Sequence, residues 1–156
     1  MHNDVKEIVE RLQEVLLSGR WIANTNYREQ LYAISWQQAI QRVGRLNSIA
    51  ALTYHINYYL AGLCHAFHNQ ELLIKDEYSF DVPEIQDAAA WLALVNEFER
   101  NAKAFIAAVE QLPAKRWDTI FIDKKYGNYR RNIEGVIEHC YYHLGQVVLI
   151  RKLLQD

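Results

Sequence analysis

Two histidines near the C-terminal end of the chain, His139 and His143, have the spacing of a helical metal site. On an α-helix, residues four apart lie only ~40° apart around the axis, so both imidazoles can reach one ion. The pair alone is a weak signal, because the six histidines of the chain, placed at random, would give such a spacing in roughly one sequence in five. A zinc protease needs glutamate directly after the first histidine, and Cys140 stands there, which disfavours a protease.

A third histidine, His55, lies in another stretch with helical periodicity. On helical wheels, His143 falls ~80° and His139 ~120° from the centre of their apolar stripe, and His55 falls ~90° from its own. All three are expected at seams between helices, where they converge if the two seams face each other. His65 and His68 point away from His55 and are expected to be solvated. Small residues on the His55 side would leave room for an ion and a ligand: Ser48, Ala51, Gly62 and Ala66.

The chemistry of such a site depends on the groups beside the imidazoles. Neutral imidazoles suit Zn²⁺, Ni²⁺ or Fe²⁺, and three protein ligands leave a position open for water or substrate. The metal then activates water, as in a hydrolase, or an external thiolate, as in a thiol transferase. Glu138 is the nearest carboxylate for a general base, although a solvated surface glutamate is its simpler interpretation. Gln146 is a candidate for orienting a ligand or a metal-bound water.

The elements that must position these histidines are helices. A capping-box pattern at Ser35 predicts a short helix, and Ser48 and Asp87 are the expected N-caps of two long ones. A linker is predicted over 75–86, and a short extended arm or irregular hairpin around Gly127. Four stretches with apolar residues at three- and four-residue spacing predict an all-α four-helix bundle: about 3–18, 49–69, 88–112 and 132–154.

Composition points to a single domain over residues 1–156. Two Pro and six Gly are too few for the turns of an all-β sandwich. With 17 Lys and Arg against 19 Asp and Glu, the net charge is −2, so we expect no nucleic-acid partner. The longest apolar run, 88–95, is too short for a membrane helix, so we expect no membrane partner. Two cysteines and a charged start predict a cytoplasmic protein without a disulfide framework or signal peptide.

Two segments of the chain resemble the DinB-like (YfiT-like) family of metalloenzymes. Residues 137–151 resemble the last-helix signature of that family, a His-x-x-x-His-x-Gly-Gln pattern followed by an apolar and basic tail. Residues 47–56 match the segment of helix 2 in which the family places its first ligand. The resemblance implies a bundle with up-down-down-up helices and a divalent metal held by His55, His139 and His143.

The resemblance leaves the reaction open, because family members range from thiol-dependent transferases to proteins with no assigned activity. It implies a homodimer, and a small-molecule substrate or thiol as partner. One class of function is a metal-dependent hydrolase or thiol transferase; the other is a non-catalytic binding or dimerisation module with a structural or incidental metal. These classes differ in the fourth coordination position, which is open in an enzyme and closed by a side chain in a structural site. A metal-free module would keep His55 away from the other two histidines.

Overall fold

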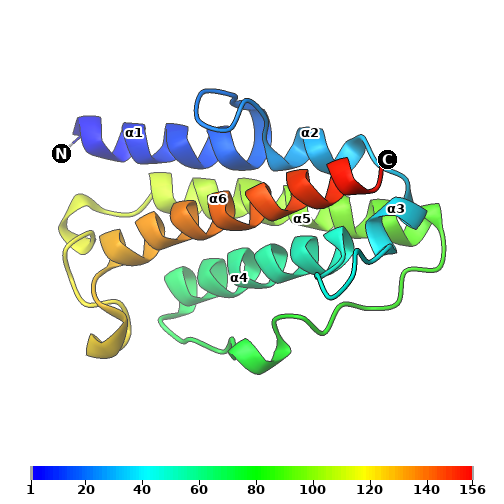
Figure 1. Ribbon diagram of the computed structural model, residues 1–156. Helices are drawn as coiled ribbons and strands as arrows, with labels where there is room; N and C mark the ends of the chain where they lie inside the picture. The colour runs from blue at the N-terminus through cyan, green and yellow to red at the C-terminus, as the bar shows by residue number, and fades with distance from the viewer. Residues whose placement is uncertain (1, 156) are drawn as a thin grey trace.

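The computed structural model describes residues 2–155, and this part of the chain is all-helical (Figure 1). Two short helices, α2 (Tyr27–Tyr32) and α3 (Trp36–Ile40), lie between the first two long helical segments. The all-α fold with long helices is therefore confirmed. The long segments are α1 (His2–Gln13) with the π-helical turn Glu14–Ser18 that continues it, α4 (Ile49–Asn69), α5 (Ala88–Glu110) and α6 (Tyr129–Leu153).

The long helices pack along one common direction (Figure 1). In this view α1 and α6 run from left to right, whereas α4 and α5 run from right to left. Because α4 and α5 follow each other in the chain and run the same way, the segment between them must return along the bundle. A helix of 21 residues such as α4 is about 30 Å long. Residues 70–87 make this return with one 3₁₀ turn, Asp76–Tyr78, which explains why the linker is long.

Side-chain caps fix the starts of the long helices α4 and α5 and of the short helix α3. Ser48 accepts a hydrogen bond from the backbone N–H of Ala51, and Asp87 accepts one from that of Ala90, as predicted for the starts of α4 and α5. Both hydrogen bonds of the predicted capping box at Ser35 are present at the start of α3. These caps satisfy backbone donors that the first helical turn leaves unpaired.

The segment before α6 differs from the prediction. The hairpin expected around Gly127 is reduced to one antiparallel bridge between Ile120 and Asn128. α6 begins at Tyr129, three residues earlier than predicted, because the Asn128 side chain accepts from the backbone N–H of Arg131 at 2.8 Å. The other local difference is α2, a short helix in a polar stretch where the periodicity predicts no long helix.

The core between the helices is apolar and continuous. The buried hydroxyl of Tyr27 donates to the backbone carbonyl of Cys140 at 2.9 Å and so joins α2 to α6 beside His139. Cys64 and Cys140 are both free thiols. None of the helices between residues 2 and 155 is both long enough and apolar enough to cross a bilayer. An aromatic cluster packs near the start of α6: Phe67, Phe105, Phe121 and Tyr129.

The cap of α5 provides a test of the fold. Asp87→Ala removes the oxygen that accepts from Ala90 N–H at 2.7 Å and is expected to lower the free energy of unfolding by about 1 kcal/mol. Asp87→Asn keeps an acceptor and should lose only a small part of this. Urea unfolding measures both, and an alanine variant as stable as the wild type would show that the cap contributes nothing.

Candidate metal centre

Three imidazoles meet between α4 and α6. His55 comes from the first half of α4, and His139 and His143 come from successive turns of α6. The Nε2 atom of His139 lies 3.1 Å from Nε2 of His55 and 2.9 Å from Nε2 of His143. One potential ligand nitrogen of each ring lies within 4.8 Å of the other two. The convergence predicted from the seams is therefore present, and the arrangement expected of a metal-free module, with His55 apart, is not.

Hydrogen bonds on the far side of two rings determine which nitrogen faces the centre. His55 Nδ1 lies 3.3 Å from the backbone carbonyl oxygen of Ser79, and His143 Nδ1 lies 2.6 Å from Oε1 of Gln146. Both oxygens are acceptors, so each Nδ1 must carry the proton and donate it. In a neutral ring, Nε2 then presents its lone pair to the centre, which is the tautomer that a metal ligand needs.

The three nitrogens cannot satisfy one another by hydrogen bonding. Nε2 of His55 and Nε2 of His143 are both acceptors, and Nε2 of His139 carries at most one proton. That proton can serve one neighbour, which leaves the other lone pair facing the cluster without a donor. A cation at the centre satisfies all three nitrogens at once. The donor set therefore fits a divalent ion with a preference for imidazole, such as Zn²⁺, Ni²⁺ or Fe²⁺.

Burial keeps the imidazoles in the neutral form that binds metal. His55 is 6% exposed and His143 is 7% exposed, while His139 is half-buried. Burial, together with the neighbouring His143 and His139, lowers the pKa of His55 to about 4. Burial and the neighbouring His143 lower the pKa of His139 to about 4, and burial lowers the pKa of His143 as well. At neutral pH no proton has to leave these rings before a metal binds.

The linker between α4 and α5 covers His55. The ring of Phe80 stacks on the His55 imidazole, with centroids 4.0 Å apart and planes 11° apart, and Ser79 supplies the carbonyl that holds Nδ1. The free space expected beside Gly62 is filled, because a Cβ there would collide with the side chain of Ile74. Sequence reasoning missed Ser79 and Phe80 as site residues because a linker without periodicity carries no signal of what it folds over.

Tyr59, one turn after His55 on α4, connects the linker to the histidine cluster. Its ring contacts His55 and His139 edge-on, with centroid distances of 5.0 and 5.4 Å. Its hydroxyl donates to the carboxylate of Asp76 at 2.6 Å. Burial and this hydrogen bond raise the pKa of Tyr59 to about 12, so the hydroxyl keeps its proton at neutral pH. The 3₁₀ turn of the linker is thereby fastened beside the candidate centre.

The other residues considered from the sequence lie outside the cluster, apart from Gln146, which orients His143. Glu138 is exposed and pairs with Arg131 at 3.0 Å, which confirms its interpretation as a solvated surface residue. His68 is exposed as predicted. The prediction for His65 is wrong, because this residue is half-buried and its Nε2 atom is buried without a hydrogen-bond partner. A helical wheel gives the direction of a side chain, but not what other elements place over it.

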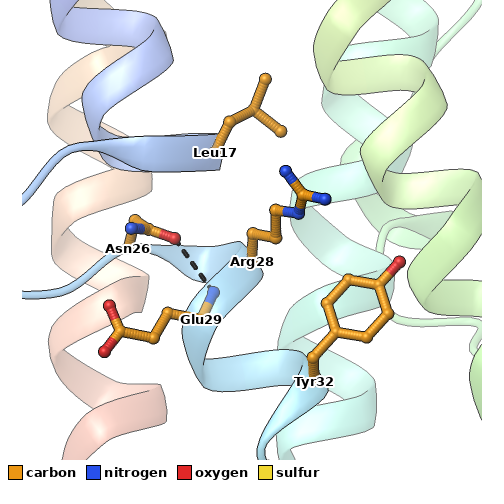
Figure 2. Close-up of a pocket in the computed structure, with 5 residues that line it drawn as sticks. All are labelled: Leu17, Asn26, Arg28, Glu29 and Tyr32. Atoms are coloured by element: carbon orange, nitrogen blue, oxygen red, sulfur yellow. Dashed lines mark hydrogen bonds between the residues drawn. The ribbon is translucent and has the colours of Figure 1, made fainter.

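A hollow of about 360 Å³ lies elsewhere on the molecule, beside α2 and the π-helical turn (Figure 2). Figure 2 shows Arg28 and Tyr32 on one side of α2 and the side chain of Glu29 turned the other way. The charged groups are already engaged, since Glu29 pairs with Arg20 at 2.6 Å and Arg28 with Glu99 at 3.5 Å. This hollow contains none of the three histidines and does not offer a competing metal centre. Its lining is Leu17, Asn26, Arg28, Glu29 and Tyr32.

Together, the helical fold and the histidine cluster define a class of helical proteins with a candidate metal centre. A family model described as the DinB superfamily matches residues 24–147, a range that contains His55, His139 and His143. The chain therefore belongs to the DinB superfamily. Searches of curated proteins and of solved structures gave no significant match.

The depressed pKa values predict how the chelator-treated protein responds to acid. A histidine in the unfolded chain has a pKa near ~6.5, whereas those of His55 and His139 are about 4 in the folded protein. Between these values the unfolded state binds protons that the folded state does not, so the free energy of unfolding falls as the pH falls from 6.5 toward 4. Urea unfolding at pH 7 and at pH 5 measures this difference.

The matched variants are His139→Asn and His68→Asn. The first removes one of the groups with a depressed pKa and should reduce the difference between the two pH values. The second changes an exposed histidine on α4 and should leave the difference as it is. A metal-free protein that is equally stable or more stable at pH 5 would contradict the prediction.

Proposed function

We propose that this protein is a divalent-metal-dependent enzyme that acts on a small molecule, with the metal held by His55, His139 and His143. The observation that carries the proposal is the convergence of three imidazole nitrogens on one point, two of them oriented by hydrogen bonds from outside the cluster. Membership of the DinB superfamily supports it, because the resemblance seen in the sequence implies a metal at these positions.

The number of ligands favours an enzymatic site over a structural one. Among residues 2–155, no fourth His, Cys, Asp or Glu joins the group of three. Structural zinc sites are usually closed by four protein ligands, whereas catalytic sites keep one position for water or substrate. The composition of this group therefore supports a centre that is accessible to an external molecule.

Each surrounding residue has a role that follows from its contacts. Ser79 and Gln146 hold the protons on the outer nitrogens and orient the rings of His55 and His143. Phe80 and Tyr59 cover the cluster and limit access of water. A bound metal would supply Lewis-acid activation of a water molecule or a thiolate at its open position.

The carboxylates near the cluster favour thiol transfer over hydrolysis. Hydrolysis requires a general base that can reach the water, and the two nearby candidates are engaged elsewhere. Glu138 pairs with Arg131 on the surface, and Asp76 accepts a hydrogen bond from the Tyr59 hydroxyl. A small-molecule thiol has a pKa near ~8.5, and a bound metal would favour its thiolate form, so its proton can pass to bulk water without a protein base. We therefore favour the thiol-dependent transferase among the two reactions.

Metal analysis tests the proposed ligand set. The purified wild-type protein is expected to bind about one divalent ion per chain after loading and desalting. His139→Ala and His143→Ala should each lose most of this metal, because two remaining imidazoles hold an ion far less tightly. His68→Ala, which changes an exposed histidine of α4, is the matched control and should keep it. Unchanged metal content in both ligand variants would refute the site.

Gln146 gives a second test, directed at the residue that orients His143. Gln146→Ala removes the oxygen that accepts from Nδ1 and is expected to weaken metal affinity by about 10-fold to 100-fold. Gln146→Glu keeps an acceptor oxygen and should retain most of the affinity. Competition with a chromophoric chelator measures both, and an alanine variant with wild-type affinity would show that this hydrogen bond does not support the centre.

A further inference from the structure

A cavity of about 590 Å³ lies beside the histidine cluster, between α4 and α6. Its wall on α6 begins at Arg131 and ends at His139, so it follows that helix for about two turns, or about 12 Å. Tyr59 lines it from α4, and Leu72 together with residues 74–76 of the linker closes one side. The cavity therefore leads to the ring of His139, the histidine whose Nε2 atom is close to both other ligands.

The lining of this cavity has an apolar part and a charged part. Its charged groups are two cations, Lys75 and Arg131, and one carboxylate, Asp76. Asp76 accepts from Tyr59, and Arg131 pairs with Glu138. The ammonium of Lys75 lies 5.9 Å from the centre of the Tyr78 ring, and it has no ion pair within residues 2–155. The apolar wall consists of Leu63, Leu72, Ile74, Phe121 and Val136.

Gly135 keeps the middle of the cavity open. It lies one turn before His139 on the same face of α6 and lines the cavity, and an added Cβ would meet no atom within 4 Å. A glycine in the interior of a helix costs roughly 0.5–1 kcal/mol relative to alanine. No turn and no close backbone contact requires glycine here, so the packing gives no reason for this cost. The space it preserves is the path along α6 to the cluster.

We propose that this cavity binds the substrate, and that the substrate is a small organic anion with an apolar body. The anionic group is held by Lys75, with Arg131 as the second cation, and the body lies along the apolar wall past Gly135. This orientation brings the molecule against His139. The inference rests on the proposed function for its catalytic meaning, but binding in the cavity depends only on the chain's own residues.

Three probes of equal shape and different charge test the preference: phenylbutyrate, phenylbutanol and phenylbutylamine. Calorimetric titration of the metal-loaded protein is expected to give the tightest binding for the carboxylate, by about fivefold over the alcohol, and the weakest for the amine. The same order should persist in the chelator-treated protein, because Lys75 and not the metal sets it. An anion preference that disappears with the metal would overturn the assignment to Lys75.

Two pairs of variants locate the binding. Gly135→Leu should weaken all three probes by at least about tenfold by filling the cavity, whereas Gly145→Leu should not. Gly145 is also on α6 with open space around an added Cβ, but it is exposed and does not line the cavity. Lys75→Met should reduce the carboxylate to the affinity of the alcohol, whereas Lys115→Met, an exposed lysine outside the cavity, should not. Thermal unfolding and metal content of each variant report whether it is folded.

The outcomes separate this inference from the proposed function. If none of the probes binds, if the amine binds most tightly, or if folded Gly135→Leu binds like the wild type, the cavity is not an organic-anion site, whatever the metal content. If the probes bind as expected but no divalent metal is held by the histidines, the binding inference stands and the metal-dependent function fails. Lys75→Met with an undiminished preference for the carboxylate would also overturn the inference.

Discussion

Nε2 of His139 lies within hydrogen-bonding distance of Nε2 of His55 and of Nε2 of His143, and this group of three imidazole nitrogens sets the condition on which the surrounding structure depends. Lone pairs that face each other away from water are costly unless a donor or a cation lies between them. To meet this condition, α4 must present His55 to two successive turns of α6. The caps at Ser48 and Asn128 fix where these helices begin, and the Tyr27 hydroxyl holds α6 beside the cluster.

The long linker between α4 and α5 helps to orient one of these three imidazoles. The parallel course of α4 and α5 requires a return segment, and such a segment has backbone carbonyls that are not used in a helical ladder (Figure 1). One of these, from Ser79, accepts from Nδ1 of His55, and the next residue, Phe80, covers the ring. A carbonyl within a helix would already be occupied by the N–H four residues later. The topology therefore supplies the outer hydrogen bond that orients a ligand of α4.

The sequence was informative where a signal is local or periodic. The start of α4 follows from Ser48, and the His139 and His143 pair follows from helical spacing. His55 required a helical wheel to place it at a seam, and the family resemblance to connect it with the other two. Ser79 and Phe80 were not predictable, because their roles arise from where an aperiodic linker lies. The wheel also misplaced His65, whose ring is half-buried, because a wheel gives the direction of a side chain and not the packing around it.

The two faces of α6 have different roles, one in packing and the other in the candidate site. Ile133, Ile137 and Cys140 are buried in the core, and their face supplies the packing that holds the helix. The neighbouring face carries Gly135 and His139, which contribute an opening and a ligand in place of apolar contacts. A glycine inside a helix and a polar ring at a seam both break the local rules for a stable bundle. Since such departures concentrate at functional sites, finding them together on one face argues that the cavity and the histidine cluster belong to a single site.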